Sequence, residues 1–249
     1  MRAIILAAGR GSRLGALTQE QPKCLTLLAG KSLLDWQLEA LRGAGISQIG
    51  IVRGYLAEKL ARSGLAYFAN PRWTESNMVE SLLCAGVWLE REPFILSYAD
   101  LAYPAQAILA LKDEPGDIVV AYDPHWFELW QARFENPLAD AETFEIDPQG
   151  RLTEIGARAT TRDQIQGQYM GLLKFSVAGW NRTREFLNSL DAAQRQRLDM
   201  TALLRLLVAA GWTIQTVPVA CRWYEVDNEN DLQIYSSLIT QRGGELWRR

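Results

Sequence analysis

A short loop rich in glycine and arginine, with a lysine behind it, is the part of this chain best suited to chemistry. Residues 3–6 are apolar, and Gly9 and Gly11 follow them with Arg13 and Lys23 close behind. Because glycine lacks a Cβ, the backbone of such a loop can turn sharply and approach a ligand closely. Its N–H groups can bind an anion, while a guanidinium and an ammonium supply further donors to phosphate oxygens. The first 25 residues therefore predict a cradle for a triphosphate.

This loop departs from two well-known phosphate-binding patterns. The chain has no G-x-G-x-x-G with an acidic residue about twenty positions further on, and no G-x-x-x-x-G-K-[ST]. Neither a dinucleotide-binding fold nor a P-loop ATPase is indicated. Since a G-x-G by itself is also found in ordinary strand-to-helix turns, the interpretation depends on residues elsewhere in the chain.

Carboxylates in the middle and near the end of the chain are candidates for a metal site. Asp100 closely follows an apolar run at residues 93–96, and ligands of open α/β sheets lie beyond the carboxyl ends of the strands. Carboxylate and phosphate oxygens are the ligands that Mg²⁺ prefers. Strand alternation places Glu225 and Asp227 on one face, where they could join Asp100. Simpler explanations are a turn aspartate at Asp100, ahead of Pro104, and a helix N-cap at Asp227.

Charge and composition exclude several classes of function. The chain has 26 basic and 29 acidic residues, a net charge of −3, which argues against a general binder of nucleic acid or of anionic membranes. Its apolar stretches fall short of the roughly 20 residues of a spanning helix, and its amino end lacks the plan of a signal peptide. We therefore expect a cytoplasmic protein. Cys24, Cys84 and Cys221 form no C-x-x-C pair and are expected to be reduced, buried thiols.

The elements that must position these residues alternate between strand and helix in the first half of the chain. This alternation predicts an α/β fold with a Rossmann-like, doubly wound, mostly parallel mixed sheet. Strands are expected at residues 3–6, 48–52, 65–69, 93–96 and 118–122, and helices at 32–41, 56–61 and from Ser76 onward.

The middle of the chain has a different pattern. Residues 142–154 alternate apolar and polar side chains around the turn sequence D-P-Q-G, which predicts an antiparallel hairpin. A strand at 167–175 and helices at 177–190 and 199–209 follow. At 249 residues and 48% hydrophobic, the chain is expected to form a single domain, 1–249. Its expected parts are a first half with the anion-binding loop (1–122), an inserted region (123–175), and closing helices with a further strand (176–249).

Several motifs resemble those of one enzyme family. The stretch A-A-G-R-G-S-R-L followed by Q-P-K-C-L resembles the N-terminal motif of nucleotidyltransferases, which join an NTP to a phosphorylated small molecule and release pyrophosphate. The runs E-S-N-M-V-E-S-L, S-Y-A-D, G-Q-Y-M-G-L-L-K-F and W-Y-E-V-D are similar to bacterial phosphocholine cytidylyltransferases and their relatives. Sugar-1-phosphate nucleotidyltransferases usually carry a P-x-G-T-A-x-A-like stretch where this chain has S-N-M-V-E-S. The resemblance therefore favours the cytidylyl branch.

The reaction that the resemblance implies is an in-line displacement, in which a phosphate or phosphonate oxygen of the acceptor attacks the α-phosphorus of CTP. Such a reaction needs positioning and charge neutralisation more than a proton base, so His125 is not required. The resemblance implies Mg²⁺ as cofactor, held by Asp100 and Asp227, with Arg13 and Lys23 stabilising charge on the pyrophosphate side. The expected nucleotide-binding residues are Leu6, Ala7, Ala8, Gly9, Arg10, Gly11, Ser12, Arg13, Lys23, Asn77 and Ser81.

The acceptor is less closely defined. Phosphocholine, phosphoethanolamine, an aminoalkyl phosphonate or another phosphorylated metabolite fits the resemblance. An aromatic ring attracts a quaternary ammonium by roughly 0.5–2 kcal/mol, so the nine tryptophans could supply a cage, although large aromatic side chains are also ordinary core material. The resemblance implies that 1–122 is the nucleotide-binding half, that 123–175 is the inserted acceptor-binding region, and that 176–249 contains the metal-binding strand. The expected acceptor-binding residues are Trp126, Trp130, Glu142, Tyr169, Trp223, Tyr224 and Glu225.

Two alternatives stay open at this stage. One is a sugar-1-phosphate nucleotidyltransferase that uses UTP, dTTP or GTP and has no affinity for ammonium compounds. The other is a non-catalytic, nucleotide-sensing subunit, against which the presence of Lys23, Asp100 and Asp227 argues. The sequence also leaves open whether the chain forms a homodimer.

Overall fold

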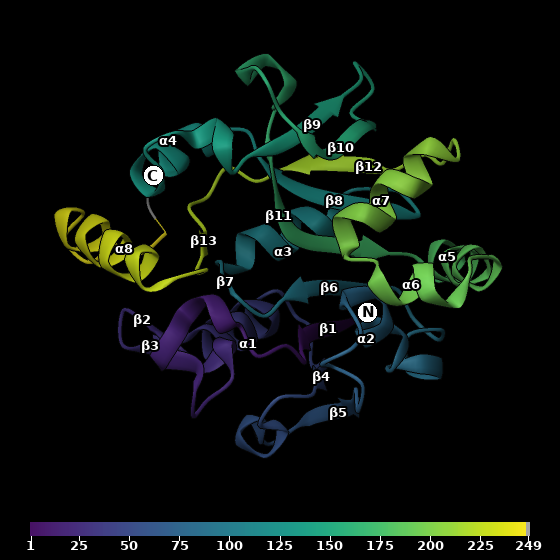
Figure 1. Ribbon diagram of the computed structural model, residues 1–249, viewed down its shortest axis with the longest axis horizontal. Helices are drawn as coiled ribbons and strands as arrows, with labels where there is room; N and C mark the ends of the chain where they lie inside the picture. The colour runs from purple at the N-terminus through teal and green to yellow at the C-terminus, as the bar shows by residue number, and fades with distance from the viewer. Residues whose placement is uncertain (248–249) are drawn as a thin grey trace.

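A seven-stranded sheet runs through the centre of the computed structural model, which describes residues 1–247 (Figure 1). Four of its six pairs of neighbouring strands are parallel, and the other two are antiparallel because one strand runs opposite to both its neighbours. The predicted fold class, a mostly parallel mixed sheet, is confirmed. The strand order is β12 (Gln215–Pro218), β8 (Ile118–Asp123), β11 (Gln168–Phe175), β6 (Phe94–Tyr98), β1 (Arg2–Ala7), β4 (Gln48–Arg53) and β5 (Leu65–Ala69), and β11 is the antiparallel strand.

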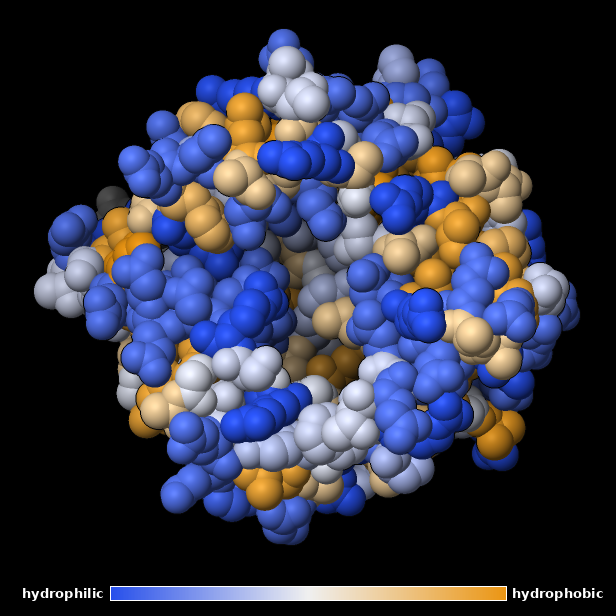
Figure 2. Space-filling model, viewed as in Figure 1, coloured by the Kyte–Doolittle hydropathy of each residue, from blue (hydrophilic) through white to orange (hydrophobic). Residues whose placement is uncertain are grey.

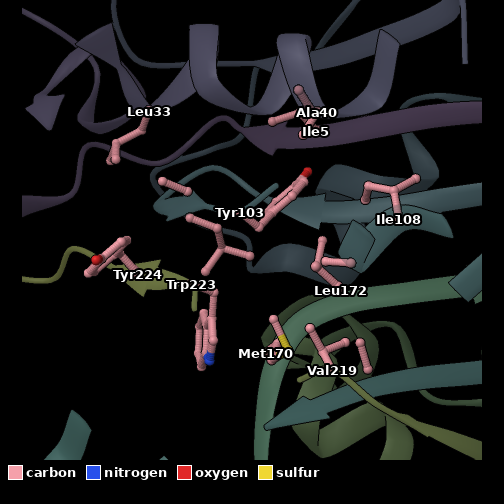
Figure 3. Packing of buried hydrophobic residues seen from close by; sticks show 14 of the residues in the cluster. Ile5, Leu33, Ala40, Tyr103, Ile108, Met170, Leu172, Val219, Trp223 and Tyr224 are labelled. Carbon is pink, nitrogen blue, oxygen red and sulfur yellow. The ribbon is translucent and has the colours of Figure 1, made fainter. Parts of the chain in front are cut away.

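The central strand β1 is buried on both faces, as its apolar run predicts. Ala3 and Ile5 belong to one hydrophobic cluster, whereas Ile4 and Leu6 belong to a second cluster across the sheet. Helices supply apolar side chains to both clusters, so the sheet is doubly wound. The first cluster, part of which Figure 3 shows, is covered by α1 (Leu33–Gly43), α3 (Ala105–Asp113), α4 (Trp126–Arg133) and α8 (Glu229–Gln241), and the second by α2 (Met78–Leu83), α5 (Val177–Ser189) and α7 (Met200–Ala209).

The predicted hairpin is present as β9 (Glu142–Ile146) and β10 (Leu152–Arg158), which pair antiparallel. Its turn is closed by the backbone N–H of Gly150, which donates to the Asp147 carbonyl at 2.9 Å, and Gly150 has the left-handed φ of +75° that glycine tolerates. The chain then returns through β11 into the middle of the main sheet. The last part of the expected insertion, 123–175, is therefore a strand of the central sheet.

A small second sheet, which the sequence did not predict in full, brings distant segments together. β7 (Leu101–Ala102) follows β6 directly and pairs antiparallel with β13 (Tyr224–Glu225). The backbone N–H of Val226 also donates to the Asp100 carbonyl at 3.0 Å. The end of β6 and the segment before α8 thus lie side by side (Figure 1).

Helix starts differ from expectation at two positions. Asn77 caps α2, with its Oδ1 accepting from the Met78 N–H at 2.8 Å, so the cap is one residue later than the expected Ser76. Asn228, not Asp227, caps α8, because its Oδ1 accepts from the Asp231 N–H at 3.1 Å. Asp227 is therefore not used as a cap.

Four elements were not predicted from the sequence: α3, α4, β12 and α6 (Ala192–Arg197).

The remaining elements are short. Before α1, two strands of two residues each, β2 (Leu27–Leu28) and β3 (Lys31–Ser32), pair antiparallel as a small hairpin. The 3-10 helices are Ser12–Thr18, Lys23–Leu25, Ala57–Leu60, Gly86–Trp88, Pro137–Ala139 and Arg162–Gln164.

The three cysteines differ in their exposure to solvent. Cys24 is buried as expected, but Cys84 is exposed and Cys221 is partly exposed, so the prediction of three buried thiols was wrong for these two. Cys84 lies at the carboxyl end of the short helix α2, where the side chain faces outward.

Within residues 1–247, none of the helices combines the length and apolar character needed to cross a membrane.

Candidate functional site

Three carboxylates meet beside the carboxyl end of β6. Asp100 lies two residues after Tyr98, the last residue of β6, Glu225 ends β13, and Asp227 lies between β13 and α8. One oxygen from each carboxylate lies within 4.8 Å of the others. The pairing of β7 with β13 produces this cluster, and it brings together Asp100 and Asp227 as the sequence analysis expected.

Lys23 lies against two of these carboxylates. Its Nζ is 2.7 Å from Asp100 Oδ2 and 2.9 Å from Asp227 Oδ1, and the residue is only 9% exposed. Burial favours the neutral amine, but the charges of the two aspartates outweigh this effect and hold the pKa of Lys23 above its ordinary value. Arg13 also pairs with Asp227 Oδ1, at 2.7 Å, while its side chain stays 71% exposed. The loop thus delivers one buried and one solvated cation to the same place.

Gly11 makes the position of Lys23 possible. Gly11 has a left-handed φ of +69°, and a Cβ added there would lie 2.7 Å from the Cβ of Lys23 and 2.9 Å from its Cδ. Contacts below 3.0 Å force a neighbour to move, so the lysine stem can lie against the loop only because residue 11 is glycine.

Arg133, on α4, is a member of the site that sequence reasoning did not identify. Its side chain is fully buried, with Nη1 3.3 Å from Glu225 Oε2 and Nη2 3.4 Å from Asp227 Oδ2. Its Nε pairs with Asp231 Oδ1 at 3.0 Å, and Asp231 Oδ2 accepts from the Asp227 and Asn228 N–H groups. Arg133 and Asp231 therefore fix the start of α8 and the orientation of Asp227. No sequence pattern signals this, because the arginine lies about 90 residues before its partners.

The surroundings shift the pKa values of Glu225 and Asp227 in opposite directions. Burial and the negative charges of Asp227 and Asp100 raise the pKa of Glu225 to about 8. Burial alone would raise the pKa of Asp227 too, but Lys23, Arg13 and Arg133 hold it below its ordinary value. The cluster is thus balanced between carboxylate repulsion and the three surrounding cations.

A cavity of about 230 Å³, hereafter the loop cavity, opens beside this cluster. Figure 2 shows a hollow in the middle of the molecule in the view of Figure 1. Arg10 and Ser12 are not among the described residues that line the loop cavity, and the Arg10 guanidinium lies 5.7 Å from the centroid of the Tyr55 ring. The other expected nucleotide-binding residues do line it: Leu6, Ala7, Ala8, Gly9, Gly11, Arg13, Lys23, Asn77 and Ser81.

Two of these lining residues also have structural roles. Asn77 caps α2 with its Oδ1 and donates from Nδ2 to the Arg197 carbonyl at 3.1 Å. Ser81 Oγ accepts from Asn70 Nδ2 at 2.9 Å. Trp73 and Asp100 also line the cavity, and the sequence analysis did not assign Trp73 to it.

A second cavity of about 260 Å³, hereafter the acidic cavity, adjoins the first, since Arg13, Met78 and Tyr98 line both. Arg13 is the only basic residue among its described lining residues. Burial and the charges of Asp199 and Asp140 raise the pKa of Glu142. The carboxylates that line the acidic cavity are Asp140, Glu142, Asp199, Glu225 and Asp227. The expected acceptor-binding residues that line it are Trp130, Glu142, Tyr169 and Glu225.

The other expected acceptor residues lie elsewhere. Trp223 and Tyr224 are fully buried in the first hydrophobic cluster (Figure 3), where Trp223 Nε1 donates to Asp123 Oδ2 and the Tyr224 hydroxyl donates to the Leu246 carbonyl. Trp126 lines a separate surface groove, and its Nε1 donates to the Ile165 carbonyl. These three rings are used for packing, because burying a large aromatic surface stabilises the core. They do not form a cage around the acidic cavity, and only Trp130 of the expected tryptophans reaches it.

The carboxylate cluster has the donors that a hard divalent cation needs. Asp100 Oδ1 is buried and has no hydrogen-bond partner within the described part of the chain, whereas its Oδ2 faces Lys23. Asp227 and Glu225 offer further oxygens within 4.8 Å. All three are carboxylates, the ligand type that Mg²⁺ prefers, so the residues present fit such an ion.

Comparisons with known proteins identify the family of this chain. The sequence model of the MobA-like NTP transferase domain matches residues 3–162. A CTP:phosphoglutamine cytidylyltransferase from Campylobacter jejuni is 35% identical over 250 residues, which cover 94% of this chain and 98% of the relative. A choline-phosphate cytidylyltransferase from Streptococcus pneumoniae is 36% identical over 102 residues, 39% of this chain and 42% of the relative.

A solved structure has the same fold. The inositol-1-phosphate CTP transferase from T. maritima superposes with a TM-score of 0.75 at 20% identity, covering 96% of each chain. Since the domain model matches well over half of the chain and the Campylobacter relative aligns along nearly all of it, this protein is a nucleotidyltransferase and belongs to the family with a MobA-like NTP transferase domain.

Proposed function

We propose that this protein transfers the cytidylyl group of CTP to a small acceptor and releases pyrophosphate. The acceptor carries a phosphate or phosphonate at one end and an ammonium group at the other. The names of the Campylobacter jejuni and Streptococcus pneumoniae relatives support CTP as the donor. Phosphoglutamine, named for the former, belongs to this acceptor class because the α-amino group of an amino acid is protonated at neutral pH.

The observation that carries the proposal is the position of the carboxylate cluster between two adjoining cavities. Lys23 and Asp100 line the loop cavity, while Glu225 and Asp227 line the acidic cavity. A donor in the first and an acceptor in the second would meet at this boundary. Such an arrangement suits an in-line transfer, in which attacking and leaving oxygens lie on opposite sides of the phosphorus.

The residues around the boundary supply positioning and charge neutralisation. Gly11, Lys23 and Arg13 would hold the β- and γ-phosphates, so that charge developing on the leaving pyrophosphate is met by an ammonium and a guanidinium. Asp100 and Asp227, assisted by Glu225, would hold Mg²⁺, which supplies Lewis-acid stabilisation of phosphate charge when bound. Because the attacking phosphate oxygen is already anionic, no side chain has to remove a proton.

The acidic cavity supports an acceptor with a positive end. Asp140 and Glu142, at the start of the hairpin, and Asp199, the N-cap of α7, line it. Desolvated carboxylates repel one another, and an ammonium placed among them would relieve that repulsion through charge-assisted hydrogen bonds. Trp130 and Tyr169 add aromatic surface to the same cavity.

The test is pyrophosphate release with each of four NTPs against a panel of acceptors in the presence of Mg²⁺. The panel contains phosphoglutamine, phosphocholine, phosphoethanolamine, 2-aminoethylphosphonate and glucose 1-phosphate. We expect turnover with CTP and at least one ammonium-bearing acceptor, and none with glucose 1-phosphate. Turnover with UTP or dTTP and the sugar phosphate would overturn the proposal.

A further inference from the structure

Trp73 lines one wall of the loop cavity. It lies in the loop between β5 and α2, which Asn70 organises: its Nδ2 donates to Ser76 Oγ at 3.0 Å and to Ser81 Oγ at 2.9 Å, and its Oδ1 accepts from the Arg72 N–H at 2.9 Å. Asn70 is 3% exposed. A buried, fully paired side chain thus sets the shape of the loop that carries the indole.

The root of the indole packs against the backbone of Gly54, just after β4. A Cβ added to Gly54, just after β4, would lie 2.7 Å from Trp73 Cβ and Cγ and 2.6 Å from the Ala8 carbonyl oxygen, just after β1. The Tyr55 ring meets the indole edge-on, with centroids 5.4 Å apart. Trp73 is nevertheless half-buried and lines the cavity, so part of the indole stays available to a ligand.

The sheet places Trp73 and the carboxylate cluster at opposite ends of that cavity. β1 lies between β6, which leads to Asp100, and β4, which leads to Gly54 beneath the indole. Neighbouring strands are about 4.8 Å apart, so the two ends are separated by roughly 10 Å across the end of β1. A nucleotide whose phosphates lie at Lys23 and Asp100 would extend its base toward the β4 side.

We propose that Trp73 stacks on the nucleobase and supplies much of the affinity for the nucleoside part of the donor. This inference rests on the proposed nucleotide site. Tyr98 is the other aromatic residue among the described lining residues, but it also lines the acidic cavity and packs edge-on against Tyr169, with centroids 5.9 Å apart. Every base offers a π-face, so stacking on Trp73 raises affinity for all NTPs and leaves the choice of base to polar contacts.

The experiment is direct binding of CTP and of inorganic tripolyphosphate, measured by calorimetry on the full chain without acceptor. We expect Trp73→Ala to weaken CTP binding by about 5- to 150-fold and to leave tripolyphosphate binding unchanged. Trp73→Phe keeps a ring and should stay within about threefold of the wild type. Trp212→Ala removes an equally half-buried indole that packs on Phe186 outside both cavities, and should change neither affinity.

Three outcomes would overturn the inference. The first is unchanged CTP binding in Trp73→Ala. The second is an equal loss of affinity for CTP and for tripolyphosphate in that variant, which indicates a structural defect. The third is a loss of CTP affinity in Trp73→Phe as large as that in Trp73→Ala. Because no acceptor is present and no product is measured, these outcomes are independent of the turnover test. A protein that fails to turn over any acceptor would still support stacking if only Trp73→Ala lost its preference for CTP over tripolyphosphate.

Discussion

The ammonium of Lys23 lies 2.9 Å from the carboxylate of Asp227, although 204 residues separate them in the sequence. The same ammonium contacts Asp100 at 2.7 Å. One buried cation therefore joins the glycine-rich loop near the start of the chain to carboxylates from its middle and its end, and the predictions below follow from this arrangement.

Replacing Lys23 by methionine is expected to lower kcat/KM for CTP by about 100- to 1000-fold, because a preorganised donor to the leaving pyrophosphate is lost. Steady-state pyrophosphate release measures this. Lys31→Met, which removes a partly exposed lysine paired with Glu39, is the matched control and should leave kcat/KM unchanged. Wild-type kinetics in Lys23→Met would assign the lysine a purely structural role.

Asp100→Asn and Asp227→Asn are each expected to lower Mg²⁺-dependent turnover by at least about 100-fold, since an amide keeps the shape of the ligand but loses its charge. Titration of turnover with Mg²⁺ checks this, and far-UV circular dichroism checks that the fold is kept. Asp163→Asn, in the separate surface groove beside α4, is the control. If either variant is as active as the wild type, that aspartate is not a metal ligand.

Gly11→Ala separates steric contact with Lys23 from backbone strain. Alanine at a φ of +69° costs about 1–2 kcal/mol of stability, and the same cost applies to Gly211→Ala at +77°. Only at residue 11 would the new Cβ collide with the Lys23 side chain, since residue 211 has open space around it. Thermal unfolding should show a loss for both variants, larger in Gly11→Ala because Lys23 must also move, while CTP affinity should fall in Gly11→Ala alone. Equal affinities would show that Lys23 can move without consequence.

Arg133→Met is expected to lower the free energy of unfolding by about 3–5 kcal/mol, because it leaves the carboxylate of Asp231 buried and without its cation. Urea denaturation measures the loss. The double variant with Asp231→Asn should recover part of it, and the half-saturating Mg²⁺ concentration should rise in the single variant because Glu225 and Asp227 lose their orientation. Arg184→Met breaks a partly exposed pair with Glu90 and should cost at most about 1 kcal/mol. A stability equal to the wild type in Arg133→Met would contradict this role.

Glu142→Gln is expected to raise KM for an ammonium-bearing acceptor by about tenfold and to leave KM for CTP unchanged, since it removes one charged hydrogen-bond acceptor from the acidic cavity. Bisubstrate kinetics provide both constants. Glu145→Gln lies on the same strand but is not among the described residues lining that cavity, so it serves as control. A rise in KM for CTP instead would place Glu142 on the donor side.

Features of this protein that depend on local pattern could be predicted from the sequence. The apolar run of β1 and the glycines after it predict a buried strand and an anion-binding loop, and the turn before Gly150 predicts the hairpin, because period, turn residues and strand length are encoded by neighbours in the chain. The sequence also indicated Lys23, Asp100 and Asp227, since each follows a recognisable strand or motif.

Which residues share a cavity depends on long-range contacts that form when the chain folds. The pairing of β7 with β13, two strands of two residues each, is too short to leave a pattern in the sequence, yet it brings Asp227 to Asp100. Trp223, Tyr224 and Trp130 are all large aromatic residues, but the first two are enclosed in the core and the third reaches the acidic cavity. Arg133 and Trp73 acquire their positions from partners that are distant in the sequence or from backbone packing. Burial and long-range contact are properties of the assembled chain, and no local spacing encodes them.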